Sequence, residues 1–431
     1  MINKQESQKL PSKASESERN KPTRLKIAYI MSRFPKLTET FILYEMLAMQ
    51  EQGIQVEVYP LLREKVEVMH PEAEAFVRIA HYQPFINLPI IRANLHFLLK
   101  KPGAYLKTLW TLLRANWGSF NYFTGVLGIF PKVVLFADQM REQNIDHVHA
   151  HFASHPAAAG FIIHRLVGIP YSFTAHGSDL HRDRHMLREK VAEAAFVAAI
   201  SDYNRNLILS ECQGKYGDRV RVIHCGVDTD VFHVRSGETP FEKGENPFRI
   251  LCIGTLHEVK GQAYLIDACH LLWERGIDFI CHFAGDGEDR AALTALADQV
   301  GLASKVHFHG RLTRDEIAQL LQDADVLAAP SVPTSDGRRE GIPVVLMEAM
   351  GSGVPVVASA LSGIPELVID QQTGLLTPPR DAESLADALE CYFSDKELRK
   401  RLGKAGREKV VKEFDLNKNA TLLIQHFSKE G

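Results

Sequence analysis

The chain has 431 residues and a mass of 48.3 kDa, which is too long for one ordinary hydrophobic core; a length of about 150 residues per domain predicts two or three domains. Hydrophobic residues make up 45% and charged residues 24% of the chain, which is typical of a globular protein and excludes a disordered or fibrous one. The formal net charge is −3. Because proteins that bind phosphate backbones are strongly basic, we expect no nucleic-acid partner.

The first residues and the cysteines indicate the compartment. Residues 1–24 are polar and mixed in charge, which predicts a disordered tail rather than a secretory signal. The six cysteines form no C-x-x-C pair, so we expect buried thiols in a reducing compartment and neither disulfides nor a zinc site. No run of about 18 uncharged apolar residues occurs, which disfavours a membrane-spanning helix. The expected location is therefore the cytoplasm.

Short apolar runs rich in β-forming residues alternate with longer helical patterns along nearly the whole chain. The first half contains six such runs, at residues 25–31, 54–59, 146–150, 171–175, 196–200 and 219–223. The second half contains six more, at residues 248–254, 279–285, 305–310, 326–330, 355–359 and 374–378. Continuous apolar strands that alternate with helices predict parallel sheets covered on both faces. We therefore expect an α/β chain made of two Rossmann-like, doubly wound domains.

The domain boundaries follow from breaks in this pattern. The stretch 233–247 is rich in glycine, proline and charge, which predicts an interdomain linker. It separates an N-terminal domain, residues 25–232, from a C-terminal domain, residues 248–395. Residues 396–431 show a helical pattern and no further strand, so we expect the chain to end in helices.

One insertion in the N-terminal domain, at about residues 75–137, contains no acidic residue. Its basic residues are Arg78, Arg92, Lys100, Lys101, Lys107, Arg114 and Lys132, and its aromatic residues include Phe97, Tyr105, Trp110, Trp117, Phe120, Tyr122 and Phe123. Basic and aromatic side chains on helices favour an anionic membrane surface. The alternative is an ordinary buried insertion with solvated lysines.

Polar residues and glycines cluster where the predicted strands end. In the first half these are Arg33, His149, His151 and His176, and in the second half Lys260, Gly285–Gly287, Gly310 and residues 331–340. In open α/β sheets, ligands bind outside the carboxyl ends of the strands. Two domains that face each other through these ends would enclose a cleft, which suits an enzyme that joins a phosphate-bearing donor to a separate acceptor.

The strongest signal is the segment REGIPVVLMEAMGSGVPVVAS at residues 339–359. Pro343 fits the first turn of a helix, so Glu340 would precede this helix and Glu348 would lie within it. The rest of the helix is apolar and should be buried, where an ionised carboxylate is costly unless it is hydrogen-bonded. Sugar or ribose hydroxyls are suitable partners. The alternative is a glutamate that pairs with a buried arginine or with the helix dipole.

The spacing of the two glutamates resembles the E-x(7)-E motif of retaining glycosyltransferases of family 4, which have the two-domain GT-B fold. The resemblance extends over nearly the whole ordered chain and includes HCGVD (224–228), GTLHEVKG (254–261), FAGDGEDR (283–290), VHFHGRL (306–312), ADVLAAPS (324–331) and SGIPELV (362–368). Three N-terminal segments are similar more narrowly to the exopolysaccharide and colanic-acid branch of that family, namely SRFPKLTETFI (32–42), HVHAHFA (147–153) and SFTAHGSD (172–179).

This resemblance implies a role for each residue of the site. Three residues would be catalytic: His176 would bind the donor sugar, Glu340 would bind the sugar hydroxyls, and Lys260 would neutralise the leaving diphosphate. Glu348 would hold the ribose. The donor site as a whole would comprise Gly254, Thr255, Lys260, Gly285, Gly310, Arg311, Leu312, Glu340, Gly341, Ile342, Pro343, Val344 and Glu348. The acceptor would contact Arg33 and His151. The implied donor is a UDP- or GDP-sugar, and the implied transfer retains the anomeric configuration.

No metal or other cofactor is expected. A lysine and a helix N-terminus can stabilise a departing diphosphate, and no aspartate-rich pattern stands out in the chain. His147, His149 and His151 alternate as on a strand, but we expect no Asp, Glu or Cys to supply the fourth ligand of a metal site. We expect His147 and His149 to be structural.

One position departs from the family pattern. The family usually has arginine after the glycine of GTL, where this chain has Thr255. Arginine binds phosphate through two parallel hydrogen bonds and threonine cannot. Arg338 and Arg339, beside Glu340, are candidates for the missing charge; otherwise we expect weak activity.

Together these observations predict a cytoplasmic enzyme, peripheral at the inner face of the membrane. It would move a hexosyl unit from a sugar nucleotide to a lipid-linked saccharide or a growing polysaccharide. Two alternatives remain, a sugar-nucleotide epimerase of the same fold and a non-catalytic binding subunit of that fold.

Overall fold

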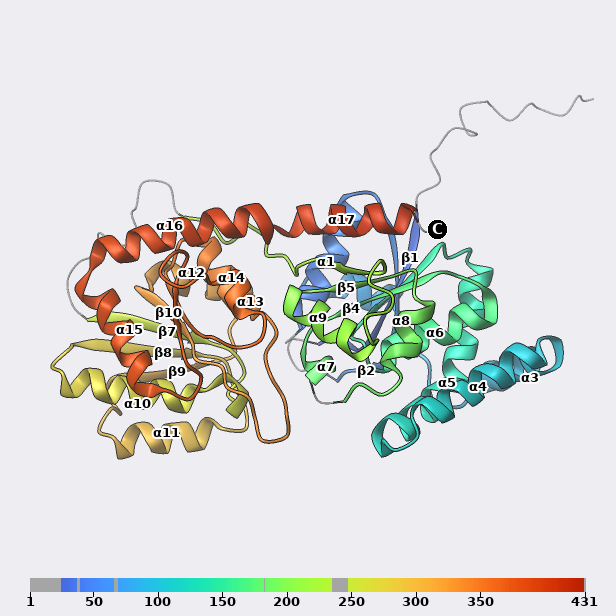
Figure 1. Cartoon of the computed structure of the whole chain (residues 1–431), viewed down its shortest axis with the longest axis horizontal. Helices are drawn as coiled ribbons and strands as arrows, with labels where there is room; N and C mark the ends of the chain where they lie inside the picture. The colour runs from blue at the N-terminus through green and yellow to red at the C-terminus, as the bar shows by residue number, and fades with distance from the viewer. Residues whose placement is uncertain (1–24, 37–38, 66–68, 182, 235–246, 430–431) are drawn as a thin grey trace, which may run out of the picture.

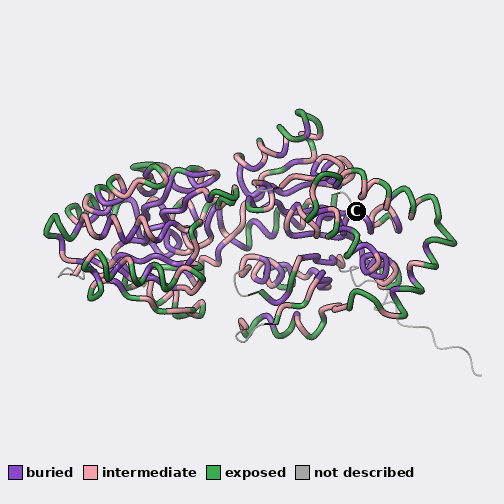
Figure 2. The backbone as a smooth tube through the Cα atoms, turned by 90° about the horizontal axis from the view of Figure 1, so that it is seen from below, coloured by how far each residue is buried: buried purple, intermediate pink, exposed green. Residues whose placement is uncertain are grey.

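The computed structural model describes residues 25–36, 39–65, 69–181, 183–234 and 247–429. The predicted tail, residues 1–24, and most of the predicted linker, residues 233–247, lie outside the described residues. The described chain forms two α/β domains that lie side by side, each with its own buried interior (Figures 1 and 2).

The first domain is built on a parallel sheet in the order β2-β1-β3-β4-β5-β6. Its strands are β1 (Lys26–Phe34), β2 (Gln55–Arg63), β3 (His147–His151), β4 (Tyr171–Ala175), β5 (Phe196–Ala199) and β6 (Val220–Val222). Its helices are α1 (Thr40–Glu51), α2 (Ala73–Ile79), α3 (Leu88–Lys100), α4 (Pro102–Ala115), α5 (Phe120–Glu142), α6 (His155–Val167), α7 (Ser178–His181), α8 (Leu187–Glu193) and α9 (Asp202–Glu211). All six strands predicted for this half are present, and burial of β3, β4 and β5 along their whole length explains their continuous apolar runs.

The second domain repeats the plan in the order β12-β11-β10-β7-β8-β9, again parallel. Its strands are β7 (Phe248–Ile253), β8 (Phe279–Ala284), β9 (Val306–Gly310), β10 (Val326–Ala329), β11 (Val356–Ser359) and β12 (Leu375–Thr377). Its helices are α10 (Gln262–Glu274), α11 (Arg290–Gln299), α12 (Arg314–Asp323), α13 (Val344–Gly351), α14 (Ile364–Leu367), α15 (Ala382–Ser394) and α16 (Lys396–Glu413). Helices α10, α11 and α15 cover one face of the sheet, and α12, α13 and α14 cover the other. Helix α16 contributes to both sides, with Leu402 buried on the first and Val410 on the second.

The last helix, α17 (Leu416–Lys429), belongs to the first domain although it ends the chain. It lies along α1 (Figure 1), and its Leu423 and Phe427 are buried with the strands of the first sheet. The crossing back is fixed by hydrogen bonds from the Val227 amide to the Phe414 carbonyl (2.9 Å) and from the Leu416 amide to the Val227 carbonyl (3.0 Å). The predicted helices at residues 396–431 are therefore divided between the two domains.

Helices α3 and α4 project from the first domain, and the predicted insertion is indeed helical (Figure 1). Of its seven basic residues, Lys132 is buried and donates to the Leu61 carbonyl (2.8 Å), so it does not belong to the surface as the sequence suggested. Phe97 and Tyr122 are likewise core residues. The exposed apolar side chains, which we call the apolar helical face, are Ile79, Phe85, Ile86, Leu88, Ile91, Leu95, Leu98, Leu99, Leu106, Trp110, Trp117, Phe120 and Leu127.

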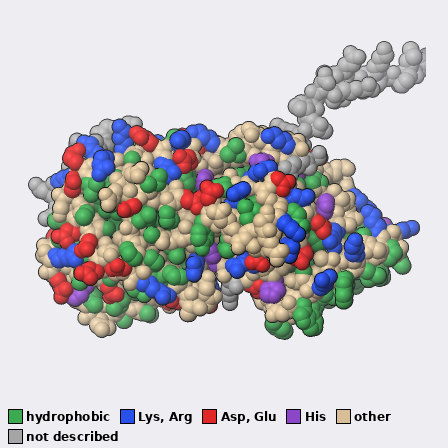
Figure 3. Space-filling model, in the orientation of Figure 1, with side chains coloured by type: hydrophobic (Ala, Val, Ile, Leu, Met, Phe, Trp, Pro, Cys, Tyr) green, Lys and Arg blue, Asp and Glu red, His purple; other side chains and the backbone are tan. Residues whose placement is uncertain are grey.

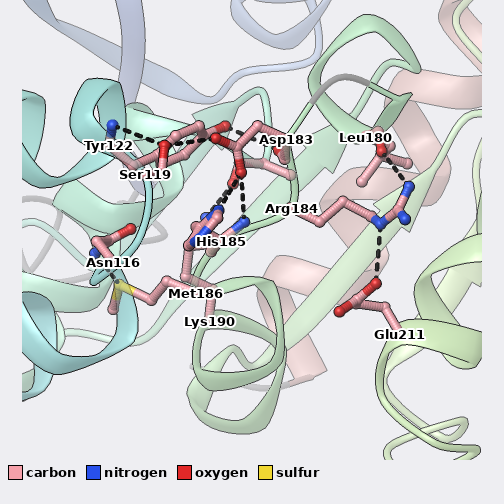
Figure 4. A network of polar contacts seen from close by, with 11 residues as sticks. Asn116, Ser119, Tyr122, Leu180, Asp183, Arg184, His185, Met186, Lys190 and Glu211 are labelled. Carbon is pink, nitrogen blue, oxygen red and sulfur yellow. Dashed lines mark hydrogen bonds and ion pairs between the residues drawn. The ribbon is translucent and has the colours of Figure 1, made fainter. Parts of the chain in front are cut away.

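A polar network fastens this insertion to the rest of the first domain (Figure 4). The Ser119 hydroxyl donates to the Asp183 carboxylate (2.7 Å), and the Tyr122 hydroxyl donates to the Asp183 carbonyl (3.2 Å). The Asn116 amide lies 3.5 Å from the Met186 sulfur. The loop held in this way follows α7, so the insertion is fixed to the segment that begins at the end of β4.

Helix α5 is long and apolar enough to cross a membrane by length and composition alone, which the sequence analysis did not expect. However, 56% of its most apolar window is buried inside the domain. It packs against α3 and α6, and its Val133, Val134 and Phe136 are fully buried. These contacts are those of the core helix of a globular domain.

Candidate active site

The order of strands in each sheet fixes where a ligand can bind. In the second sheet β7 lies between β10 and β8, so the loops after β7 and β10 leave the sheet in opposite directions. In the first sheet the same reversal falls between β1 and β3. Lys260 follows β7 and Glu340 follows β10, which places both at the point where open α/β sheets bind their ligands.

The two domains meet backbone to backbone at this point. A Cβ on Gly341 would lie 2.4 Å from the His176 carbonyl oxygen, and a Cβ on Gly177 would lie 3.0 Å from the Gly341 Cα. Gly177 also has a φ of +117°, which disfavours any side chain. His176 and Gly341, predicted to share the site from opposite domains, are therefore brought together.

A second contact between the domains is made by Glu366 of α14. Its carboxylate accepts hydrogen bonds from the amides of Asp202 (2.7 Å) and Tyr203 (2.8 Å) in the first turn of α9. A carboxylate at a helix N-terminus satisfies amides that have no partner within the helix. This contact joins the SGIPELV segment, noted above only for its resemblance, to the first domain.

Glycines close the carboxyl ends of β7, β8 and β9. The Gly285 amide donates to the Gly310 carbonyl (2.7 Å), and a Cβ on Gly285 would lie 2.0 Å from the Gly254 oxygen. The φ angles of Gly254, Gly285 and Gly310 are +150°, +142° and +74°, a region that favours glycine. The three predicted glycines therefore lie together at the edge of the sheet beside Lys260.

Lys260 forms an ion pair with Glu340, with 2.7 Å between Nζ and Oε2. Lys260 ends the 3₁₀ turn Glu258–Lys260, and the next residue, Gly261, has a φ of +69° and packs so closely that a Cβ would lie 1.9 Å from the Pro330 oxygen. Both charged side chains are about one-fifth exposed, at 21% and 18%. Two predicted catalytic residues thus lie in contact and remain accessible to a ligand.

Glu348 lies on α13, as predicted, but the helix starts one residue later than expected. Pro343 is its N-cap, with an extended ψ of 129°, and Val344 is the first helical residue. Burial raises the pKa of Glu348 to about 7, which the nearby Arg314 and Lys260 partly oppose. The carboxylate therefore occupies an unfavourable position that hydrogen-bond donors of a ligand would improve.

Arg314 connects this region to the first domain. Its guanidinium donates to Asp228 (3.0 Å) and lies 3.9 Å above the ring of Tyr44 in α1. A cation over an aromatic ring is attracted by the ring face. Sequence reasoning missed both Arg314 and Tyr44, because neither belongs to a motif and only the fold brings Arg314, at the start of α12, over the ring of Tyr44.

The missing arginine at Thr255 is not replaced directly. Arg338 pairs with Asp336 (3.1 Å) and contacts His257 (3.1 Å). Arg339 is exposed, and it adds to burial in lowering the pKa of His181. Thr255 is exposed at the end of β7. Arg338 and Arg339 therefore stay candidates for the additional phosphate partner.

Four further residues that were predicted to bind the donor lie on the second domain. Arg311 is exposed and Leu312 is half-buried directly after β9, while Ile342 and Pro343 are buried before α13. A Cβ on Gly363 would lie 3.0 Å from Ile342 Cγ1, so Ile342 packs against the segment that carries Glu366. Their role in binding remains a prediction.

His151 corrects one expectation of the sequence analysis. It was expected to contact the acceptor, but it is fully buried, with 3.0 Å between its Nδ1 and Nε2 of His176. It therefore lies behind His176 and cannot touch an acceptor in this arrangement. Arg33 is half exposed and pairs with Glu64 (3.2 Å), so acceptor contact by Arg33 stays a prediction.

His147 and His149 are buried and bonded to polar neighbours, in agreement with a structural role. Both contact the Ser172 hydroxyl, at 2.7 and 2.8 Å, and His149 Nε2 lies 2.9 Å from the Thr174 hydroxyl. Within the described residues, Glu45, His149 and His151 offer ligand atoms within 4.8 Å of one another. The sequence gives no sign of Glu45, because it belongs to no motif and only the fold brings its carboxylate to 3.3 Å from His151 Nε2.

Comparison with known proteins places this geometry in a family. Residues 114–231 match the family described as Glycosyltransferase Family 4, and residues 238–409 match Glycosyl transferases group 1. A putative colanic acid biosynthesis glycosyltransferase, WcaL of Escherichia coli (strain K12), is 30% identical over 421 residues, which cover 93% of this chain and 100% of the relative. The chain is a group 1 glycosyltransferase. The family predicted from the motifs is thereby confirmed.

Further relatives of this glycosyltransferase agree. The amylovoran biosynthesis glycosyltransferase AmsK of Erwinia amylovora is 29% identical, with 85% of this chain and 90% of the relative covered. A glycosyltransferase from Rickettsia africae has a TM-score of 0.70 at 18% identity and covers 95% of this chain and 99% of its own. Anabaena HepE in complex with UDP-glucose has a TM-score of 0.68 at 19% identity and covers 94% and 100%. These structures and the two six-stranded sheets confirm the predicted GT-B fold.

Proposed function

We propose that this glycosyltransferase moves a hexosyl unit, with retention of anomeric configuration, from a UDP- or GDP-sugar to a lipid-linked saccharide or growing polysaccharide in exopolysaccharide synthesis. The observation that carries the proposal is the Lys260–Glu340 pair beside the start of α13, with Glu348 further along that helix. The names of the relatives, which refer to colanic acid and amylovoran biosynthesis, support this class of product.

The charges at the site suit the departure of a nucleoside diphosphate. Breaking a glycosyl phosphate bond leaves positive charge on the sugar ring and negative charge on the diphosphate. Lys260 and the free amides at the start of α13 would stabilise that anion, and Glu340, released from Lys260, would accept hydrogen bonds from the sugar hydroxyls. The leaving phosphate would accept the proton of the acceptor hydroxyl, so the proposal requires no metal ion.

Glu348 and the neighbouring structures support a nucleotide as the donor. A carboxylate accepts two vicinal hydroxyl donors well, and the ribose of a nucleotide offers such a pair. HepE, a neighbour in fold, has been solved with UDP and with UDP-glucose. A panel of uridine and guanosine sugar nucleotides, screened by thermal shift, would identify the donor, because a ligand that binds only the folded state raises its stability.

The reaction is then tested with the identified donor. Incubation with an extract of lipid-linked saccharides is expected to give a glycosylated lipid and free nucleoside diphosphate. Isomerisation of the donor in the absence of acceptor would instead show the epimerase. If no donor is hydrolysed or transferred, or if hydrolysis survives in Glu340→Gln, the proposed site is wrong.

The apolar helical face supports a position at the inner face of the membrane, where such an acceptor is available. Figure 3 shows apolar side chains gathered over the projecting helices with lysine and arginine close by. Trp110, Trp117 and Phe120 are 67%, 77% and 85% exposed, and exposed apolar patches of this kind mark interaction sites. Arg92, Lys100, Lys107 and Arg114 are exposed on the same helices, which favours anionic lipid.

We expect the full chain to co-sediment with vesicles of phosphatidylcholine and phosphatidylglycerol at low salt and to be released at high salt. The double variant Trp110→Ser, Trp117→Ser should lose roughly tenfold or more in lipid affinity, because interfacial binding scales with the apolar area that it buries. Trp273→Ser, which alters an exposed tryptophan of the second domain, is the matched control. Absence of binding to anionic vesicles at low salt would rule out this membrane surface.

A further inference from the structure

The carboxylate of Asp179, in the first turn of α7, reaches back to the ends of two neighbouring strands. Its Oδ1 accepts hydrogen bonds from the amides of His176 (3.0 Å) and Gly177 (2.8 Å), which directly follow β4. Its Oδ2 accepts a hydrogen bond from the amide of Ala153 (2.5 Å), which follows β3. One carboxylate therefore joins the two loops that leave the carboxyl ends of β3 and β4.

These bonds fix the backbone on both sides of His176. The His176 amide belongs to the peptide unit before this residue, and the Gly177 amide belongs to the unit after it. Both units are trans, so the N–H and C=O groups of each point in opposite directions. Because the Gly177 amide points to Asp179, the His176 carbonyl of the same unit points away, toward Gly341, where a Cβ would lie 2.4 Å from that oxygen. Asp179 thus sets the direction of the His176 side chain and the surface that this loop presents to the second domain.

The bond to Ala153 supports His176 from a second side. Phe152, the preceding residue, has a φ of +80°, which is unfavourable for a residue with a side chain. The Ala153 amide is held by Asp179, and the Ala153 carbonyl accepts a hydrogen bond from the buried Lys190 (2.5 Å). The ring of Phe152 packs on that of His176, with 4.8 Å between their centroids. Asp179 therefore also holds the backbone that carries this aromatic neighbour.

Capping of α7 does not account for these bonds. The amides of Leu180 and His181 in this short helix donate to the Gly177 carbonyl, at 2.8 and 3.1 Å. The Asp179 carboxylate instead binds amides that precede the helix. Both of its oxygens are engaged with the backbone in this way, so Asp179 is not placed to take a proton from an acceptor. An effect of Asp179 on the reaction would therefore act through His176.

We infer that Asp179 is a positioning residue for glycosyl transfer, whose carboxylate fixes the peptide units on both sides of His176 and thereby the position of the imidazole at the site. This inference rests on the proposed function, because that function assigns His176 to the donor sugar. The hold on the amides of His176 and Gly177 is a property of the free protein and is measured without a donor.

Hydrogen exchange of the free, full chain tests this hold on the backbone. In Asp179→Ala, peptides that contain residues 176–177 should exchange their amide hydrogens about tenfold faster than in the wild type, or more, because a hydrogen bond to a charged group is worth at least about that factor. Mass spectrometry of the peptides measures the rates. Asp395→Ala is the matched control, because it removes a carboxylate that accepts from the Leu398 amide (2.9 Å) at the start of α16; it should leave these rates unchanged. Unchanged exchange in Asp179→Ala would overturn the inference.

Kinetics with the donor identified by the thermal-shift panel test the effect on transfer. Asp179→Ala should lower kcat by roughly 10- to 100-fold and change KM for the donor by less than about threefold, because a small displacement at the reacting centre affects the reacting geometry more than binding. Asp395→Ala should keep the kcat of the wild type, which separates positioning from a general loss of stability. Thermal unfolding of each variant shows that the rates are measured on folded protein.

Asp179→Asn separates positioning from an effect of the charge itself. Asparagine keeps one oxygen, which can accept hydrogen bonds from both amides. Its kcat should fall only if the amides of His176 and Gly177 lose their protection. Full kcat in Asp179→Ala, or a low kcat in Asp179→Asn with both amides still protected, would refute the inference. Failure of every donor with the wild type, while exchange behaves as expected, would refute the proposed function alone.

Discussion

Replacing Lys260 with alanine should lower the turnover of the sugar nucleotide by about 10³-fold, because loss of one preorganised group that stabilises a developing anion costs about 10²–10³-fold and Lys260 carries a full charge. In the free protein this lysine is neutralised by Glu340 at 2.7 Å. When the donor binds, we expect its diphosphate to take the place of that carboxylate. The measurement is the rate of nucleoside diphosphate release at saturating donor.

Lys305→Ala is the matched control for Lys260→Ala. Lys305 is similarly exposed (23%) and is also paired with a carboxylate, that of Asp278, but it precedes β9 and lies at the amino-terminal edge of the sheet, away from the site. Both variants should unfold within a few degrees of the wild type, because partly exposed ion pairs contribute about 0–1 kcal/mol. Normal turnover in Lys260→Ala would show that the diphosphate binds elsewhere.

Replacing Glu348 with glutamine should weaken the binding of UDP by roughly 10- to 100-fold and at the same time stabilise the free protein at high pH. The affinity falls because hydrogen bonds to an ionised group are worth about 1.5–3 kcal/mol and those to a neutral amide are weaker. Stability rises because the ionised carboxylate is unfavourable in its buried position. Calorimetric titration with UDP and thermal unfolding measure the two effects.

The pH dependence follows from the pKa of Glu348, which burial raises from 4.5 to about 7. The folded state therefore favours the protonated acid, and this contribution to stability is fully present below about pH 4.5 and is lost as the pH rises through about 7. Wild type and Glu348→Gln should unfold alike at about pH 4, whereas at about pH 8.5 the variant should be more stable by about 1–2 kcal/mol.

The affinity for UDP should depend on pH in the opposite direction to the stability. UDP affinity of the wild type should increase as the pH rises through about 7, since ionised Glu348 is the better acceptor, and that of Glu348→Gln should not change over this range. Glu383→Gln, at an exposed residue of α15, should leave both properties unchanged. If the affinity of Glu348→Gln equals that of the wild type at high pH, Glu348 does not hold the ribose.

The fold was predictable because each of its signals is local. Strands such as β4 and β5 are buried on both faces and read as continuous apolar runs, and alternation with helices implies the parallel order of each sheet. Pairing between distant elements leaves no such signal. The position of α17 on the first domain depends on how Phe427 packs against Phe196 and His147, and the helical pattern of residues 416–429 fits either domain equally well.

The same difference between local signals and contacts of distant elements applies to the candidate site. Lys260, Glu340 and Glu348 belong to short motifs at strand ends and helix starts, where the sequence itself indicates the chemistry. Tyr44 and Glu45 lie on α1, whose pattern is that of an ordinary helix, and their partners Arg314 and His151 are far away in the chain. His151 stands at a strand end, where the sequence predicts contact with the acceptor. Its burial under α1 depends on tertiary packing and leaves no local signal in the sequence.

The return of the chain at α17 has a consequence for how the protein is made. During synthesis the strands of the first domain leave the ribosome long before Leu423 and Phe427, the residues that cover part of their surface. At about 5–20 residues per second, the roughly 190 residues between β6 and α17 take about 10–40 s to add. Over that interval Phe196 and His147 lack the aromatic ring that covers them in the finished chain. We expect the nascent first domain to expose this apolar surface until α17 is added, and a fragment that stops at residue 234 to be less stable than the full chain because α17 is missing.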